Sequence, residues 1–187
     1  MKSISFEKRP VIWKHSTVIE LLLFFFDNPT EEFFEKQVAD KTKVSAGAAN
    51  KYLKILAKEG FLRIEKKGNM NFYSLERENP VVRHMKIAYS LSKPITSELK
   101  NLSKKLNVKI YVYGSVARGE DTEESDWDIL AIGQAGLSEI EGELNVIRKK
   151  FGEKLKLMAF SVSEWARMEK NDKAFYERVE KDKIELV

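Results

Sequence analysis

The chain has 187 residues, which is room for one ordinary domain or two small ones. Hydrophobic residues make up 43% and charged residues 33% of the chain, which excludes a disordered or collagen-like protein. The absence of cysteine excludes a disulfide framework, a thiolate nucleophile and a cysteine-bound zinc ion. The net charge is +4, and it is unevenly spread: residues 1–90 carry 16 Lys or Arg against 11 Asp or Glu, whereas residues 91–187 carry 17 against 18.

The sequence shows no sign of a membrane segment. Its most apolar run, residues 18–26, is interrupted by Glu20 and is much shorter than the roughly 20 residues that a membrane span needs. The first ten residues lack the apolar core and the cleavage site of a signal peptide. We therefore expect a cytoplasmic protein.

Residues 1–78 predict three helices followed by a β-hairpin. Asn28-Pro29 ends the first helix, and Thr30 is a candidate cap for the second. Ser45 caps the third helix, which ends at Gly60. The expected bounds are 16–27, 31–40 and 45–59 for the helices, and 61–65 and 71–75 for the strands of the hairpin.

The third helix has one basic and one apolar face. At 100° per residue, Asn50 and three lysines fall within about 60° of Gly47, and the apolar residues fall on the opposite side. Lysines suit phosphates, and asparagine can read adenine in the major groove. The candidate DNA-binding residues are Lys43, Ser45, Asn50, Lys51, Lys54, Lys58, Lys66, Lys67 and Asn69.

The segment VSAGAANKYLKILAKEGFLRIEKKGNMNFYSL resembles the recognition helix and wing of winged helix-turn-helix transcription regulators. The resemblance covers roughly residues 11–78 and implies DNA binding. Winged helices also serve as protein-docking modules, so a structural or interaction role stays open.

A second motif follows a predicted strand at residues 109–113. The strand runs into Gly114-Ser115, and Asp126-Trp127-Asp128 opens another strand. The two aspartates alternate with Trp127, which places both carboxylates on one face of the strand. Adjacent carboxylates repel each other unless a cation neutralises them, and hard oxygen ligands favour Mg²⁺ bound together with substrate phosphates.

Residues around Gly114 are suited to binding phosphates. Glycine lets a ligand approach the backbone closely, and Ser115 is expected at a helix N-terminus, where its hydroxyl and free N–H groups can hold phosphate oxygens. Arg118 lies within one turn and can add a bidentate contact.

The segment YGSVARGEDTEESDWDIL resembles the active-site signature of the DNA polymerase beta-like nucleotidyltransferase superfamily, and most closely the minimal nucleotidyltransferases of prokaryotes. The resemblance implies an α+β domain with a mixed sheet and flanking helices. It also implies transfer of a nucleoside monophosphate from an NTP to a hydroxyl acceptor. Gly114, Ser115 and Arg118 would bind the nucleotide, and Asp126 and Asp128 would be catalytic and would bind two Mg²⁺ ions.

One part of the superfamily pattern is missing. Members carry a third carboxylate on a later strand, expected here at residues 154–162, but the sequence KLKLMAFSV contains no acid. Lys156, Leu157 or Met158 would take that place, and Glu153 and Glu164 only flank the strand. An alternative is therefore a transcription regulator whose degenerate transferase domain senses nucleotide or mediates assembly. A third hypothesis is an antitoxin-like partner of a small helical toxin.

The resulting organisation is a winged helix DNA-binding domain at 1–78, a helical linker at 79–107 that packs on the second domain, and a nucleotidyltransferase-like domain at 108–187. The expected partners are DNA and an NTP, and a homodimer is the default expectation. Trp165, Phe175 and Tyr176 are expected in a core or interface rather than in a base-stacking platform. Trp13 is expected in the core or at a dimer contact, and His15 and His84 are expected to be structural.

Overall fold

A computed structural model describes residues 16–152 and 154–187. The chain divides into two compact units, with the boundary between Tyr89 and Ser90. Trp13, His15 and Glu153 lie outside the described residues.

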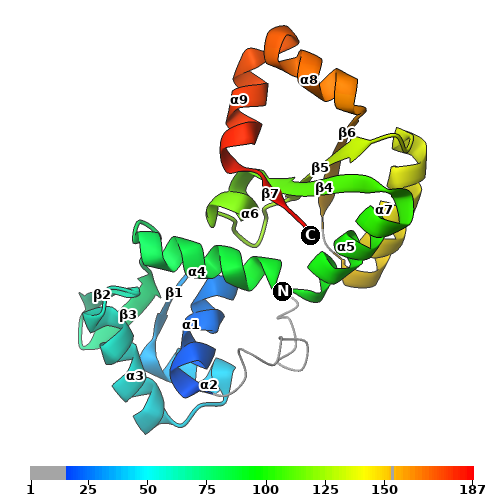
Figure 1. The fold of residues 1–187 in the computed structure, drawn as a ribbon. Coiled ribbons are helices and arrows are strands. Elements are labelled where there is room, and N and C mark those ends of the chain that lie inside the picture. The colour runs from blue at the N-terminus through cyan, green and yellow to red at the C-terminus, as the bar shows by residue number, and fades with distance from the viewer. Residues whose placement is uncertain (1–15, 153) are drawn as a thin grey trace. The chain divides into compact units, whose positions relative to one another are not determined.

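The first unit combines helices with a small antiparallel sheet (Figure 1). The sheet has the strand order β1-β3-β2. The elements in chain order are α1 (Thr17–Asp27), β1 (Glu32–Phe34), α2 (Glu35–Thr42), α3 (Ala46–Lys58), β2 (Leu62–Lys67), β3 (Met70–Leu75) and α4 (Pro80–Leu91).

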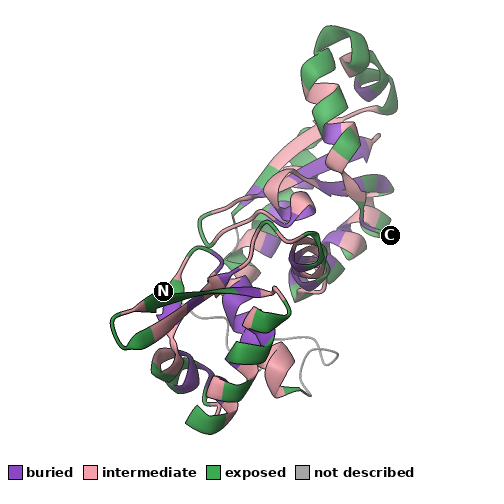
Figure 2. Ribbon diagram, turned by 90° about the vertical axis from the view of Figure 1, so that its left-hand side faces the viewer, coloured by how far each residue is buried: buried purple, intermediate pink, exposed green. Residues whose placement is uncertain are grey.

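The core of the first unit is built around the second half of α1, where six consecutive residues from Leu21 to Phe26 are buried. Figure 2 shows buried segments inside this unit and exposed outer helix faces. Phe24 and Phe25 pack against Phe33 with ring-centroid separations of 4.8 and 6.1 Å. Aromatic contacts of this kind therefore join α1 to the sheet.

The expected helix at residues 31–40 is wrong in its first part. Glu32–Phe34 forms strand β1, which pairs antiparallel with β3 and places Phe33 opposite Tyr73. Helix α2 begins only at Glu35, and Gln37 Oε1 accepts a hydrogen bond from the Phe34 N–H at 3.1 Å. The strand forms because Phe34 gains a cross-strand contact with Phe72 and Phe33 packs on the rings of α1, and a local helical pattern reveals neither.

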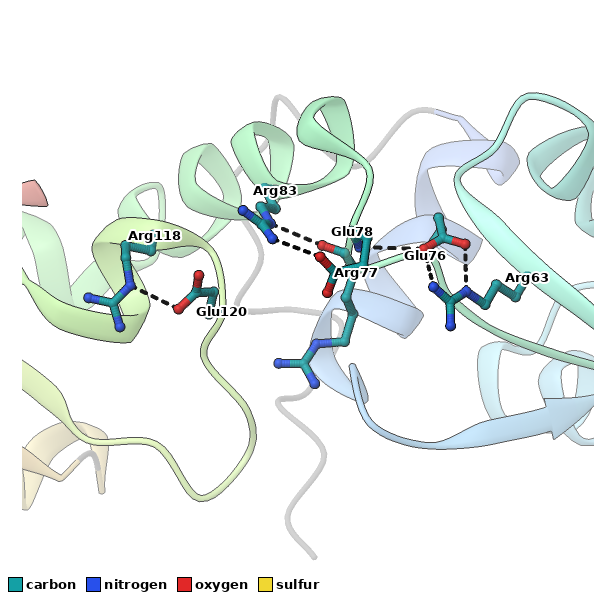
Figure 3. A network of polar contacts seen from close by, with 7 residues as sticks. All are labelled: Arg63, Glu76, Arg77, Glu78, Arg83, Arg118 and Glu120. Atoms are coloured by element: carbon teal, nitrogen blue, oxygen red, sulfur yellow. Dashed lines mark hydrogen bonds and ion pairs between the residues drawn. The ribbon is translucent and has the colours of Figure 1, made fainter.

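The third helix and the hairpin follow the sequence prediction. The Ser45 hydroxyl accepts a hydrogen bond from the Ala48 N–H at 3.3 Å, and this bond caps α3. Gly60 has a φ of 77°, which explains why glycine ends this segment. Arg63 in β2 binds Glu76 through two hydrogen bonds of 2.6 and 2.8 Å, which fixes the end of the hairpin (Figure 3).

The second unit is an α+β structure with a four-stranded mixed sheet. The strand order is β6-β5-β4-β7, with β5 and β6 parallel and the other pairs antiparallel. The elements are α5 (Pro94–Leu106), β4 (Val108–Tyr113), α6 (Gly114–Arg118), β5 (Trp127–Gly133), α7 (Leu137–Phe151), β6 (Leu155–Phe160), α8 (Val162–Asn171), α9 (Lys173–Asp182) and β7 (Ile184–Glu185).

Two apolar clusters lie on opposite faces of this sheet. On one face, Ile129 and Trp127 of β5 pack with residues of α5 and α7, such as Leu99 and Leu144. On the other face, Leu130 packs with Trp165 of α8 and Val179 of α9. The position of a residue along β5 decides which of the two clusters its side chain joins, because successive side chains of a strand point to opposite faces.

The stretch expected as a linker, residues 79–107, forms the two helices α4 and α5. Val82 and Tyr89 of α4 belong to the core of the first unit, and Tyr89 Oη donates a hydrogen bond to Asp27 at 2.8 Å. Leu99 of α5 belongs to the core of the second unit. None of the helices in residues 16–152 and 154–187 has the length and apolarity needed to cross a membrane.

Candidate functional site

The turn from β4 into α6 lies directly against Asp128. Tyr113, the last residue of β4, pairs with Asp128 in the β4–β5 register. The next residue, Gly114, has a φ of 72°, and a Cβ atom added to it would lie 2.2 Å from Oδ2 of Asp128. Position 114 therefore needs glycine for two separate reasons, the backbone conformation and the space that the carboxylate occupies.

Asp126 and Asp128 lie on the face of the sheet that α8 and α9 cover. Asp128 has the same strand parity as Leu130 and Ile132, which belong to the cluster with Trp165 and Val179. Trp127 points to the opposite face, is 4% exposed and packs in the other core. The structure thus brings the Gly-Ser turn and the aspartate pair together, as the spacing in the sequence suggests.

The carboxyl group of Asp128 is partly withdrawn from water. Burial raises its pKa above the usual value, and the neighbouring Asp126 raises it further. Lys156 and two arginines, Arg118 and Arg178, oppose this rise through their positive charge. A partly buried carboxylate with several cations around it is typical of a functional site that binds a charged group.

Lys156 neutralises the aspartate pair. It lies opposite Asp128 in the parallel β5–β6 register, and its Nζ is 2.6 Å from Oδ2 of Asp126. The hydrogen bond with Asp126 raises the pKa of Lys156, so its ammonium form is favoured. A cation of the chain itself, at one of the three positions where a third acid was expected, therefore lies beside the aspartate pair.

Arg118 is held by two acids. Its Nε donates a hydrogen bond to Glu120 at 2.8 Å and its Nη1 donates one to Asp182 at 3.0 Å (Figure 3 shows the first). These bonds raise the pKa of Arg118. The two bonds use two of the five N–H donors of the guanidinium, so a phosphate contact does not require either carboxylate to leave.

Helix α9 contributes residues that sequence reasoning did not connect with the motif. Asp182 binds Arg118, and Arg178 lies near enough to lower the pKa of Asp128. The Arg178 guanidinium carbon is 5.5 Å from the ring centre of Phe175, whose ring contacts Tyr113 edge-on at 6.3 Å. These residues lie more than forty positions from Asp128, and no local pattern in the sequence links them to it.

The acids that flank β6 do not complete a three-carboxylate site. Glu164 caps α8, where its carboxylate accepts a hydrogen bond from the Ser161 N–H at 2.8 Å. Among the residues that the structure describes, no group of three or more acidic or histidine side chains could hold a metal ion. Glu153 lies outside that range.

The donor set fits one divalent cation. Mg²⁺ is usually bound by one or two carboxylates together with substrate phosphates, and Asp126 and Asp128 provide that pair. The described part of the chain offers no further acidic cluster for a second ion, and Lys156 binds one oxygen of the pair. The expected two-ion arrangement is therefore not supported by these residues.

Seven of the nine predicted DNA-binding residues of the first unit are exposed. Residues that extend into solvent are Lys43, Ser45, Lys51, Lys54, Lys58, Lys66 and Asn69. Asn50 is half-buried: it donates a hydrogen bond to Glu35 at 2.5 Å and accepts one from Lys54 at 3.0 Å. Lys67 is half-buried as well, forms an ion pair with Glu32 and lies over the Phe72 ring.

The sequence matches the model of the nucleotidyltransferase domain family over residues 93–186, which is half of the chain. The chain therefore belongs to this family, and the match begins beside α5 and ends at β7. Members of the family act on nucleotides and generally use divalent metal ions.

Two further comparisons are less informative. The search of curated proteins gave no match. An IclR family transcriptional regulator from Brucella abortus has a solved structure that is similar with a TM-score of 0.33 at 14% identity, over 82% of this chain. This chain spans 66% of that protein's length, slightly under two thirds. At such a TM-score the similarity carries no conclusion about fold or function.

Proposed function

We propose that the second unit binds a nucleoside triphosphate beside the aspartate pair and transfers its nucleoside monophosphate to a hydroxyl acceptor. The observation that carries the proposal is the close fit of Gly114 against Asp128, because it joins the Gly-Ser turn and the aspartate pair into one site. Membership of the nucleotidyltransferase family supports the same reaction class.

Each residue has a role in this proposal. Asp126 and Asp128 would hold a divalent cation together with the triphosphate, and Ser115 and the first backbone N–H groups of α6 bind phosphate oxygens. A bound divalent cation supplies neutralisation of phosphate charge as pyrophosphate leaves. Arg118, which Glu120 and Asp182 hold in place, assists through the N–H donors that these two carboxylates leave unused.

The test is release of pyrophosphate from each of the four NTPs in the presence of DNA ends, RNA ends or hydroxyl-bearing peptides. We expect release with wild type and none with Asp126→Ala/Asp128→Ala. The matched control is Glu139→Ala/Glu169→Ala, which removes two exposed acids elsewhere in the second unit. Absence of release with every acceptor class would contradict transfer to these acceptors.

A specific observation favours a second candidate. The ion pair between Lys156 and Asp126 leaves the site with a lysine where the superfamily pattern has an acid. A domain that senses nucleotide without turning it over would fit that arrangement. In that case an NTP would change the DNA affinity of the chain while no pyrophosphate is released.

We also propose that the first unit is a winged helix that binds DNA. The order of α1, α2, α3 and the β2–β3 hairpin supports this, and so do the exposed lysines of α3 and of the hairpin. Lysines bind phosphates and so carry affinity without sequence preference. Asn50 would read a base only by exchanging its hydrogen bond with Glu35, so the lysines carry most of this proposal.

A further inference from the structure

Lys156 adds a positive charge to the site that the carboxylates of Asp126 and Asp128 form. The side chain starts from β6, opposite Asp128, and its ammonium group bonds to Asp126 at 2.6 Å. About 69% of the lysine side chain is exposed, compared with 25% of the aspartate side chain. The lysine therefore reaches in from a solvent-exposed position toward a half-covered acid.

The neighbouring cations are arranged differently. Arg118 is bonded to Glu120 and Asp182, and Arg178 stacks near Phe175. Among the residues that the structure describes, Lys156 is thus the cationic side chain that forms an ion pair with the aspartate pair. Exposed ion pairs contribute little to folding stability, so stability alone does not explain why a lysine is placed there.

An ammonium group and a divalent ion compete for the same oxygen. The Lys156 ammonium group donates a hydrogen bond to one oxygen of Asp126, so that oxygen is less available to a metal ion. Its single positive charge also reduces the electrostatic attraction that the pair exerts on a metal ion. A cation that arrives alone therefore meets an aspartate pair whose negative charge Lys156 partly cancels, whereas one that arrives with a triphosphate brings further oxygen ligands and negative charge.

We propose that Lys156 is the built-in cation of this site and takes the place of one of two divalent ions, so that the site takes up a single divalent ion and binds it tightly only together with nucleotide. This inference rests on the proposed function of the second unit. In it Lys156 is a positioning residue, because it acts on the aspartate pair.

The test is Mn²⁺ binding to the full chain, followed by electron paramagnetic resonance, with and without a non-hydrolysable ATP analogue. For wild type we expect weak binding of Mn²⁺ alone and one tightly bound ion per chain when the analogue is present. For Lys156→Glu we expect Mn²⁺ alone to bind about tenfold tighter or more, and two ions with the analogue. Lys156→Met, which frees Asp126 without adding an acid, should fall between the two and replaces Lys156→Glu if that variant does not fold.

Lys154→Glu is the matched control. It makes the same charge change two residues earlier, at a lysine that pairs with Glu124 at 3.1 Å. Equal tightening in both glutamate variants, two tightly bound ions in wild type, or no tightening in Lys156→Glu would each overturn the inference. If wild type does not bind the analogue at all, the proposed function fails. If wild type binds it and Lys156→Glu still behaves like wild type, only the role of Lys156 fails.

Discussion

In the second unit, the backbone of Gly114 lies directly against the carboxylate of Asp128. A Cβ atom at position 114 would lie 2.2 Å from Oδ2 of Asp128, and the positive φ of 72° at that position already disfavours any other residue. The turn that follows β4 therefore leaves no room for a side chain between the Gly114 backbone and the Asp128 carboxylate.

Gly114→Ala should destabilise the second unit by about 1–3 kcal/mol and weaken nucleotide binding, because the new methyl group pushes Asp128 away and strains the backbone. Chemical denaturation and Mg–ATP titration measure the two effects. In an Asp128→Ala background the clash is gone, so the destabilisation should shrink to the backbone part alone. Gly142→Ala in α7 is the control, since nothing lies within 4 Å of an added Cβ there. An equal cost of Gly114→Ala in both backgrounds would contradict the fit described here.

Asp128→Asn should stabilise the protein at neutral pH, within the lower part of the roughly 0.5–2 kcal/mol that stabilising substitutions usually give, because the amide carries no charge that burial disfavours. Burial raises the pKa of Asp128, so the folded state holds this proton more tightly than the unfolded chain does. Its contribution to stability is therefore present below the unfolded pKa, near 3.8, and is lost as the pH rises through the folded pKa.

The gain from Asp128→Asn should accordingly disappear when melting is measured below about pH 4. Glu169→Gln, which removes an exposed charge from α8, should show no such pH-dependent gain. A loss of stability in Asp128→Asn at neutral pH would mean that the charged form is favoured by the fold.

Arg178→Ala should weaken Mg–ATP binding about tenfold, or ~1.4 kcal/mol, because this exposed guanidinium projects its charge onto Asp128 and is available to phosphates. Arg167→Ala makes the same change on α8, where Nε donates to the Ser163 carbonyl at 3.2 Å. Calorimetric titration of both variants checks the prediction. Equal affinities for Arg178→Ala and wild type would remove α9 from the site.

Trp165→Ala should cost about 3–5 kcal/mol of stability. The side chain is 6% exposed, packs near Phe160 and Tyr176, and donates its indole N–H to Glu180 at 2.9 Å. Trp165→Phe should lose less stability and leave nucleotide affinity unchanged. Urea unfolding and nucleotide titration separate this core role from base stacking, which would show the reverse pattern.

Replacing three exposed lysines of α3, in Lys51→Ala/Lys54→Ala/Lys58→Ala, should weaken DNA binding on every sequence. It should reduce the slope of log affinity against log salt by up to about 0.9 for each lysine that contacts a phosphate. Fluorescence anisotropy over a range of salt concentrations measures the slope. Lys170→Ala/Lys173→Ala/Lys181→Ala removes the same charge from exposed positions of the second unit and should leave the slope as in wild type.

Local patterns predicted most elements correctly. Alternation along Asp126-Trp127-Asp128 placed Trp127 in the core, and the Ser45 cap is present. The pattern failed at Glu32–Phe34, where pairing with β3 overrides the helical spacing.

In the candidate site, too, the sequence predicted the local features but not the contacts that depend on tertiary packing. The Gly-Ser turn and the aspartate pair meet because β4 and β5 are neighbours, which strand and turn signals already suggest. The bond between Lys156 and Asp126 depends on the parallel register of β6, and the approach of α9 depends on tertiary packing. Neither leaves a periodic signal in the chain, so both require the structure.

If Asp126 and Asp128 form a nucleotide site, their removal should abolish nucleotide binding. Calorimetric titration of Mg–ATP, and of the other NTPs, into wild type and into Asp126→Ala/Asp128→Ala measures this. We expect metal-dependent binding of at least one NTP to wild type and its loss in the double variant. Failure of every NTP to bind wild type, or equal binding by the double variant, would contradict it.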